Sequence, residues 1–169
     1  MNINSRHSAD LVNKILAIQA QLYWEELDKD IRAQYSDEVI GWITSLIRKG
    51  AIEYTPAIFM DTLLIAPAVL KKLAEKGQFF YAGSQHAVVT LPEAEGGQCH
   101  RIAHQHYRQH PGQFHYFIGV TSGEHYHSWL TDPKHQVIYE PTPYVRRMYY
   151  GVHVQDVDTF FARRYHLLM

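Results

Sequence analysis

The sequence contains a single cysteine, Cys99, among its 169 residues. An intramolecular disulfide is therefore impossible, and nothing in the composition calls for an oxidising compartment. The N-terminus also lacks the basic start, apolar run and cleavage site of a secretory signal. The most apolar window, residues 57–70, is interrupted by Asp61 and Pro67 and is too short to span a bilayer. We expect a cytoplasmic protein with no membrane partner, and export by a non-Sec route stays open.

An excess of charge of one sign is missing as well. The chain has 16 Lys and Arg against 17 Asp and Glu, which gives a net charge of −1 with histidine neutral. Without a block of like charge, a general electrostatic attraction to nucleic acid is not expected. Apolar residues make up 46% of the chain, which is ordinary for a globular protein. The length suits a single domain, residues 1–169, that buries its own core.

The two halves of the chain differ in pattern. Residues 1–77 are mainly helical, whereas residues 78–169 combine helix and strand. One predicted helix ends at Gly50, and another over residues 58–76 contains Pro67, which predicts either a kink or two shorter helices. The first helix carries apolar residues spaced for one face, Leu11, Ile15, Ile18 and Leu22.

The second half predicts a helix over residues 98–110 among several short strands, with a last helix after Asp156. The strand-like segments are residues 78–82 and 86–91 around a Gly-Ser turn, then 114–122, 125–131, 135–140 and 149–154. The predicted fold class is α+β, with N-terminal helices followed by a cysteine-bearing helix packed on an antiparallel sheet.

Cys99 follows Gly96 and Gly97 and is predicted to lie in the first turn of its helix. Unpaired N–H groups and the helix dipole at that place stabilise a thiolate and lower the thiol pKa from about 8.5. The N–H of Cys99 could hold an oxyanion, together with a second donor such as Gln98 or Gln85. The competing interpretation is a small buried side chain, which is the usual state of a lone cysteine.

A histidine and a carboxylate are predicted to meet on the following hairpin. If Thr131 faces Gln136 across the loop, then His127 faces Glu140, and directly opposed Cβ atoms lie about 4.5–5.5 Å apart. The carboxylate would orient the imidazole and leave its other nitrogen as a base. Trp129 lies on the same face and indicates that this face is buried. A slip of one residue would place the pair on opposite faces.

The order of these segments resembles that of papain-like and transglutaminase-like cysteine enzymes. The matching stretches are "GQC" (97–99), "HSW" (127–129) and "EPT" (140–142). The likeness extends to a little-characterised bacterial and phage group with Gly-x-Cys-His, His-Ser-Trp, an acid with a following threonine, and then Tyr-Tyr-Gly-Val, here "YYGV" (149–152). The resemblance implies a triad of Cys99, His127 and Glu140, with Gly97, Gln98 and Trp129 at the oxyanion or substrate site.

The chain departs from these families at three points. Glu140 stands where transglutaminases mostly have aspartate, and Ile102 stands where the small group often has asparagine. The separation of Cys99 from His127 is short, so the insertions that often build a substrate cleft are missing. These departures leave the substrate open.

Together the motifs predict a cysteine-dependent hydrolase or acyltransferase that acts on an amide, ester or thioester. Protease, amidase, deamidase and transglutaminase-like chemistry all fit, with a peptide, protein or small amide as substrate and no cofactor or metal. One alternative is a metal-binding protein or metalloenzyme that uses His125 and His127, as in cupin-type barrels. Another is a binding module without catalysis. The sequence does not fix the oligomeric state.

Overall fold

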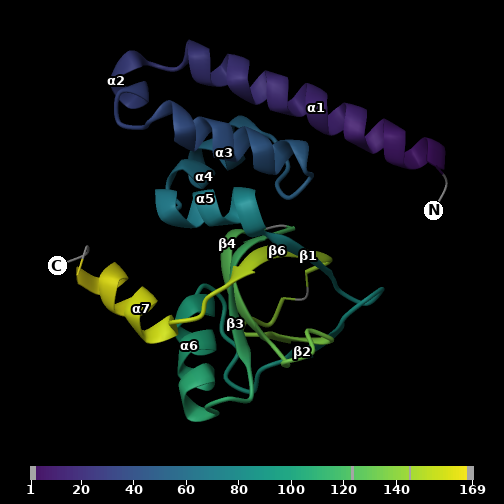
Figure 1. Cartoon of the computed structure of the whole chain (residues 1–169), viewed down its shortest axis with the longest axis vertical. Coiled ribbons are helices and arrows are strands. Elements are labelled where there is room, and N and C mark those ends of the chain that lie inside the picture. Colours follow the sequence, from purple (N-terminus) through teal and green to yellow (C-terminus); the bar gives the residue numbers. More distant parts are fainter. Residues whose placement is uncertain (1–2, 123, 145, 167–169) are drawn as a thin grey trace. The chain divides into compact units, whose positions relative to one another are not determined.

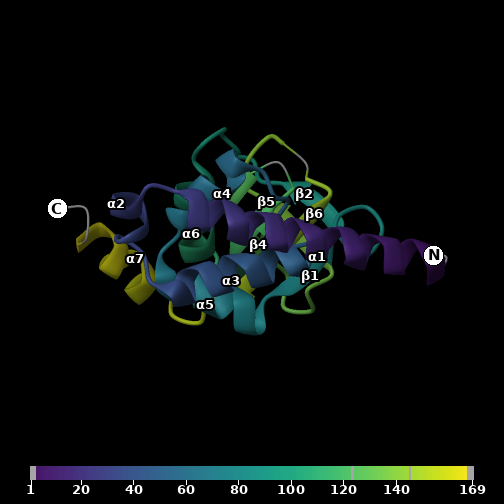
Figure 2. The same ribbon diagram turned by 90° about the horizontal axis from the view of Figure 1, so that it is seen from above.

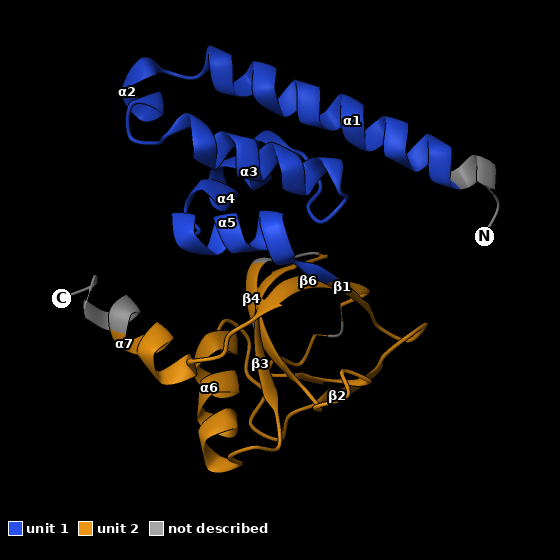
Figure 3. Ribbon diagram, in the orientation of Figure 1, with its two compact units in different colours: residues 1–78 blue, residues 79–169 orange. Residues whose placement is uncertain are grey.

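A computed structural model describes residues 3–122, 124–144 and 146–166 of the chain. The chain divides into two compact units, residues 1–78 and residues 79–169, shown in separate colours in Figure 3. The first unit is helical, and the second holds a sheet with helices, so the α+β class is confirmed. In the part of the chain that the structure describes, no helix combines the length and the hydropathy that crossing a membrane requires.

The helices of the first unit follow the predicted order (Figure 1). They are α1 (Ile3–Glu26), α2 (Lys29–Arg32), α3 (Asp37–Arg48), α4 (Pro56–Leu63) and α5 (Pro67–Lys76). Gly50, at φ +73°, follows the end of α3, as a left-handed residue after a helix commonly does. Pro56 and Pro67 each occupy the first turn of a helix, where a missing N–H costs nothing. The predicted helix over residues 58–76 is therefore two helices.

The core of the first unit lies around α3, beside which α1 runs in both Figure 1 and Figure 2. The spacing of apolar residues along α3 gives it one continuous buried face: Val39, Ile40, Ile43, Leu46 and Ile47. From α4, the buried ring of Phe59 lies 5.8 Å from Tyr23 and 6.3 Å from Trp24, both on α1. Aromatic contacts of this kind add to the free energy of burial.

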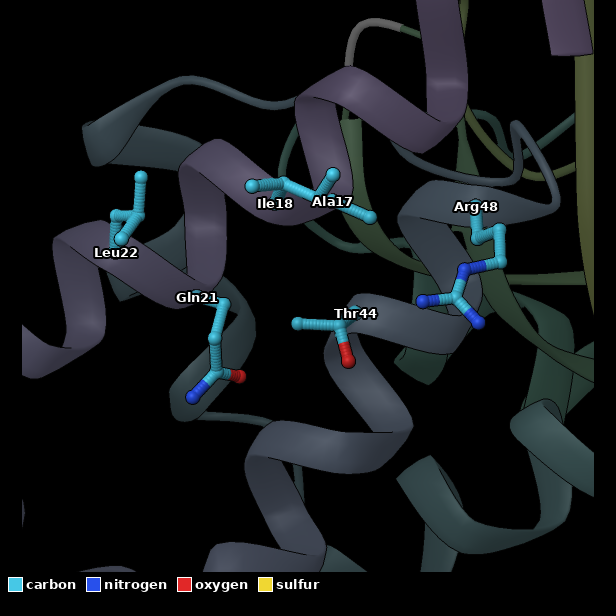
Figure 4. A pocket seen from close by; sticks show the side chains of 6 residues that line it. All are labelled: Ala17, Ile18, Gln21, Leu22, Thr44 and Arg48. Atoms are coloured by element: carbon cyan, nitrogen blue, oxygen red, sulfur yellow. The ribbon is translucent and has the colours of Figure 1, made fainter. Parts of the chain in front are cut away.

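The predicted apolar face of α1 does not face this core. Its residues are largely exposed, at 59% for Leu11, 47% for Ile15, 59% for Ile18 and 53% for Leu22. Among the described side chains of α1, the buried ones are Ala17, Ala20 and Trp24. The two alanines let α1 pack closely on its neighbours, and Trp24 packs on Phe59. Figure 4 shows residues that line a pocket between α1 and α3, among them Ile18 and Leu22 from α1 and Thr44 and Arg48 from α3. Apolar spacing correctly predicted a helix, but the apolar face that it identifies is exposed.

The second unit is built on a six-stranded sheet with the order β1-β6-β3-β4-β5-β2. The strands are β1 (Gln78–Tyr81), β2 (Ala87–Thr90), β3 (His115–Thr121), β4 (Glu124–Thr131), β5 (Val137–Glu140) and β6 (Met148–His153), and the helices are α6 (Cys99–Gln109) and α7 (Val157–His166). Although β1 and β2 are neighbours in the chain, they lie at opposite ends of this order. The β2 strand runs parallel to β5, so the sheet is mixed and the predicted wholly antiparallel sheet is wrong.

One face of the sheet carries an aromatic cluster of completely or almost completely buried side chains, Phe80, Phe117, Trp129, Ile138 and Tyr149. The rings of Phe117 and Trp129 stack with centroids 5.8 Å apart. Gly151 makes room for this packing, because a Cβ there would lie 2.3 Å from Cη2 of Trp129 and 2.8 Å from the carbonyl oxygen of Ile118. The glycine of "YYGV" is therefore explained by the tryptophan of "HSW".

The hairpin of β4 and β5 differs from the predicted register. Thr131 pairs with Ile138 rather than Gln136, and Leu130 pairs with Tyr139. This pattern places Glu140 opposite Trp129, and His127 lies two residues further along β4. Because strand side chains alternate with a period of two, a shift of two residues keeps His127 and Glu140 on the same face.

Candidate active site

Cys99 is the first residue of α6, as the sequence predicts. Gly97, at φ +74°, turns the chain into this helix, and no side-chain hydrogen bond caps the helix at Gln98. The first N–H groups of a helix have no partner within it, and they carry partial positive charge. Gly96, Gly97 and Gln98 are exposed, whereas Cys99 keeps only 6% of its surface. The thiol lies just beneath an exposed loop.

His127 and Glu140 form a completely buried pair. Nε2 of the imidazole donates to Oε1 of the carboxylate at 3.0 Å and lies 3.2 Å from Oε2. Both side chains have 0% exposure. A carboxylate without access to water needs charged or hydrogen-bonding partners, and the imidazole supplies one of them. With Nε2 held in this way, the ring orientation is fixed and Nδ1 is the nitrogen on the other side of the ring.

Glu140 receives further hydrogen bonds that hold it ionised. The Thr142 hydroxyl donates to Oε1 at 2.7 Å, the Thr142 N–H donates at 2.9 Å, and the Tyr149 hydroxyl donates to Oε2 at 2.6 Å. Nη1 of the buried Arg146 lies 3.4 Å from Oε1. Burial acts to raise the pKa of Glu140, but hydrogen bonds from His127, Tyr149 and Thr142 outweigh it and hold the pKa below its usual range.

The same arrangement keeps Tyr149 protonated. Burial and the negative charge of Glu140 both raise the pKa of the Tyr149 hydroxyl. The phenol therefore remains a hydrogen-bond donor to the carboxylate at neutral pH. The carboxylate of Glu140 is thus fixed from both sides, by His127 and by Tyr149.

The thiol of Cys99 has an unusually low pKa. Burial acts to raise it, but hydrogen bonds from His100 and His127, with the charges of both imidazoles, lower the pKa of Cys99 to about 5. At neutral pH the side chain is then a thiolate, the nucleophilic form of cysteine. The structure brings together Cys99, His127 and Glu140, as the sequence predicts, and it adds His100.

His100 is held by a partner on β4. Its Nδ1 lies 2.5 Å from Oγ of Ser128, which is completely buried, and its ring centroid lies 4.8 Å from that of Tyr126. Successive strand residues point to opposite faces, so Ser128 and His127 leave β4 on opposite sides. The start of α6 contacts both sides, with His100 on Ser128 and Cys99 beside His127.

The other predicted site residues have different positions. Gln98 is exposed, and its side-chain oxygen accepts a hydrogen bond from Nε of Arg101 at 3.1 Å. Gln85 lies in the turn after β1, where its N–H donates to the carbonyl of Tyr81. Trp129 is completely buried in the aromatic cluster, so we assign it packing against Gly151 rather than a substrate contact.

The proposed metal pair is only partly visible. The side chain of His125 lies outside the described part of the structure, and Nε2 of His127 is bound to Glu140. Among the described residues, no group of three or more His, Cys, Asp and Glu side chains is arranged to hold a metal ion. Nε2 of His127 is engaged by the carboxylate of Glu140.

Some residues of the site were not predicted from the sequence. Tyr149 and Thr142 lie within the quoted motifs "YYGV" and "EPT", so the motifs held a signal for them without indicating their role. His100 follows Cys99 directly and Ser128 follows His127, which is the signal that could have indicated a second histidine. Nothing in the sequence alone marks Arg146 as a partner of Glu140.

No protein-family model, no curated protein and no solved structure matches this chain. The likeness to papain-like and transglutaminase-like enzymes therefore rests on the quoted motifs and on the arrangement of the side chains.

Proposed function

We propose that this protein is a cysteine-dependent hydrolase or acyltransferase with a papain-like or transglutaminase-like core, acting on an amide or an activated ester. Cys99 is the nucleophile, His127 the general base and acid, and Glu140 the residue that orients His127. The substrate class is a peptide, a protein or a small amide. The observation that carries the proposal is the position of Cys99 at the start of α6 together with the completely buried His127–Glu140 pair. The lowered pKa of Cys99 supports it.

The reaction follows from these positions. The proton of Cys99 passes to His127, and the thiolate attacks the carbonyl carbon to form a C–S bond. The C–N or C–O bond of the substrate then breaks, and the proton on His127 passes to the leaving amine or alcohol. Water or an amine, deprotonated by His127, attacks the thioester carbon. The C–S bond breaks, and the proton returns to the Cys99–His127 pair.

The N–H of Cys99 is the first donor for the oxyanion, because the partial positive charge at the N-terminus of α6 stabilises the negative charge that develops on the carbonyl oxygen. The substrate carbonyl approaches from the side of Gly96, Gly97 and Gln98, which are the exposed residues before the thiol. Tyr144, which lies between β5 and β6, is the neighbour of Gly96, since a Cβ at Gly96 would lie 3.5 Å from its ring.

A structural role alone explains the buried pair poorly. Replacing a buried ion pair by apolar side chains of similar volume is often neutral or stabilising, so such pairs do not persist for stability. Here the carboxylate is kept ionised by three hydrogen-bonding side chains, while the imidazole it binds is directed at the one thiol of the chain. This directionality is what a base and its orienting acid require.

The proposal is tested with p-nitrophenyl acetate, an activated ester that needs no specific binding site. The wild type should release nitrophenol with a burst and carry an acetyl group on Cys99, identified by peptide mass spectrometry. Cys99→Ala should abolish both signals. His127→Asn should slow turnover by about 10²–10⁴-fold, the usual contribution of general acid–base catalysis.

The matched control is His104→Asn on α6, where the partly exposed His104 stacks on Phe161 and binds Asp158 at 3.2 Å. This variant should keep the wild-type burst. An unacetylated Cys99 in folded wild-type protein, or equal rates for wild type and His127→Asn, would contradict the proposed function.

A further inference from the structure

Two histidines contact the thiol, and only one of them belongs to the proposed triad. His127 reaches Cys99 from β4 with its other nitrogen bound to Glu140. His100 reaches it from the next position of α6, with Nδ1 2.5 Å from Oγ of Ser128. The two imidazoles differ in access to solvent, because His127 is completely buried and His100 is half-buried.

His100 is also more constrained than a typical surface histidine on a helix. Ser128, its partner, has no exposed surface and lies in a strand that is paired with β3 through Ile118. The ring packs on Tyr126 at a centroid distance of 4.8 Å. A hydrogen bond and a ring contact from one strand therefore determine where the imidazole of His100 lies.

We propose that His100 is a second histidine of the active site, positioned by Ser128, and that it shares the Cys99 thiolate with His127. This inference rests on the proposed function, and it assigns a different role to each of the two imidazoles. His127 carries the proton to and from the reacting groups. His100 stabilises the negative sulfur before it attacks the carbonyl carbon and again when it leaves the thioester.

The division matters most when the thioester is resolved. In that step the C–S bond breaks and the sulfur departs with the electron pair, so a group that stabilises the thiolate lowers the barrier. At this moment His127 is occupied with the proton of the attacking water. A second imidazole that needs no change of position can stabilise the sulfur at the same time.

The surrounding charges make His100 and His127 the groups to test. On the exposed side of α6, Arg101 binds Glu95 at 3.0 Å and so neutralises it. On the buried side, the charge of Glu140 is shared with His127 and with Arg146 at 3.4 Å.

The test measures how the rate of Cys99 alkylation by iodoacetamide depends on pH. The chain has one cysteine, so labelling reports on this thiol alone. The wild type should show a midpoint near pH 5. His100→Gln and His127→Asn should each raise the midpoint by about one to two pH units, the effect of losing a hydrogen bond to a charged group. The double variant should raise it further than either single variant.

Ser128→Ala tests the positioning contact and reports on it even if His100→Gln fails to fold. It should also raise the midpoint, as His100→Gln does. Combining the two substitutions should raise the midpoint little further than His100→Gln alone, because both remove the same contribution, the imidazole of His100 held by Ser128. The control is His104→Gln, one turn along the same helix, which should leave the midpoint unchanged.

The outcomes separate the two proposals. If His127→Asn raises the midpoint while His100→Gln and Ser128→Ala leave it at the wild-type value, the second histidine is wrong and the proposed function stands. If none of the three variants moves the midpoint, both proposals are wrong.

Discussion

Nε2 of His127 lies 3.0 Å from Oε1 of Glu140, and neither side chain has any exposed surface. The two residues are diagonal rather than directly opposed on β4 and β5, since Thr131 pairs with Ile138. The longer glutamate side chain reaches this diagonal position. A buried ion pair of this kind is costly to break, because the remaining partner stays buried without its counterpart.

Glu140→Gln should therefore lower the free energy of unfolding by about 3 kcal/mol. The amide nitrogen cannot accept the hydrogen bonds that Thr142 and Tyr149 now donate to the carboxylate. Urea denaturation measures the effect. Glu93→Gln is the control, because Glu93 pairs with His106 at 3.5 Å near the surface, where such a pair is worth less than about 1 kcal/mol. Equal losses in the two variants would mean that the Glu140 network adds nothing special.

Gly151→Ala should destabilise the second unit by about 1–3 kcal/mol, the usual cost of overpacking a core. The added methyl would meet Cη2 of Trp129 and the backbone of Ile118. The control is Gly41→Ala on the exposed side of α3, where nothing lies within 4 Å of the new Cβ. Helix propensity predicts a gain of up to about 1 kcal/mol for the control. Wild-type stability of Gly151→Ala would contradict the packing described here.

The first unit offers a test of the buried face of α1. Ile18→Gln should change the free energy of unfolding by less than about 0.5 kcal/mol, because Ile18 is 59% exposed. Ala20→Leu should cost about 1–3 kcal/mol, because Ala20 has no exposed surface and no room for a larger side chain. Thermal denaturation of both variants decides the point. A large loss of unfolding free energy in Ile18→Gln would show that the apolar face of α1 is buried, and would contradict the exposure described above.

A histidine cluster on the second unit predicts a loss of stability in acid. Nδ1 of His115 lies 2.7 Å from Nε2 of His135, and the rings of His115 and His153 stack at 4.6 Å. Burial and the charges of His115 and His86 lower the pKa of His135, and the charge of Asp132 acts in the opposite direction. Burial and the charges of His115 and His135 likewise lower the pKa of His153.

The sign follows from the depressed pKa of a basic group. The unfolded chain binds the proton more readily, so this contribution to stability is complete above about pH 6.5 and is lost as the pH falls towards the folded pKa. His135→Asn suits the test, because His135 has φ +55° and asparagine tolerates that conformation. The variant should lose less stability than the wild type between about pH 7 and pH 5.

Urea denaturation at several pH values provides this comparison, with His7→Asn on the exposed side of α1 as the control. The control curve should follow the wild type. Parallel curves for wild type and His135→Asn would contradict a role for the cluster in acid stability.

Much of the site was predictable because its determinants are local. The glycines before Cys99 and the absence of a strand pattern after it predict a helix over residues 98–110 with Cys99 in its first turn, and α6 begins at Cys99. The alternation of His127 and Trp129 predicts a strand with one buried face; the strand is observed, but both of its faces are buried, since Ser128 and Leu130 also have no exposed surface. The pairing of His127 with Glu140 was expected from a hairpin register that is wrong by two residues. The contact is nevertheless observed, because it requires only that both residues lie on the same face of the sheet, and a shift of two residues preserves that face.

The features that were missed depend on contacts between distant parts of the chain. The apolar residues of α1, such as Leu11, fit a helix face equally well whether that face is buried or exposed. The pairing of β2 with β5 joins strands that are not neighbours in the chain, and no local pattern specifies its direction. The contact of His100 with Ser128 likewise depends on how α6 lies on β4, which only the packed structure fixes.

The central claim is that Cys99 is a thiolate at neutral pH because imidazoles stabilise it. The direct measurement is a titration of the ultraviolet absorbance of the thiolate in folded wild-type protein, with Cys99→Ser as the blank. We predict a midpoint at about pH 5, raised in His127→Asn. A midpoint at the ordinary cysteine value of about 8.5, unchanged in that variant, would contradict the account.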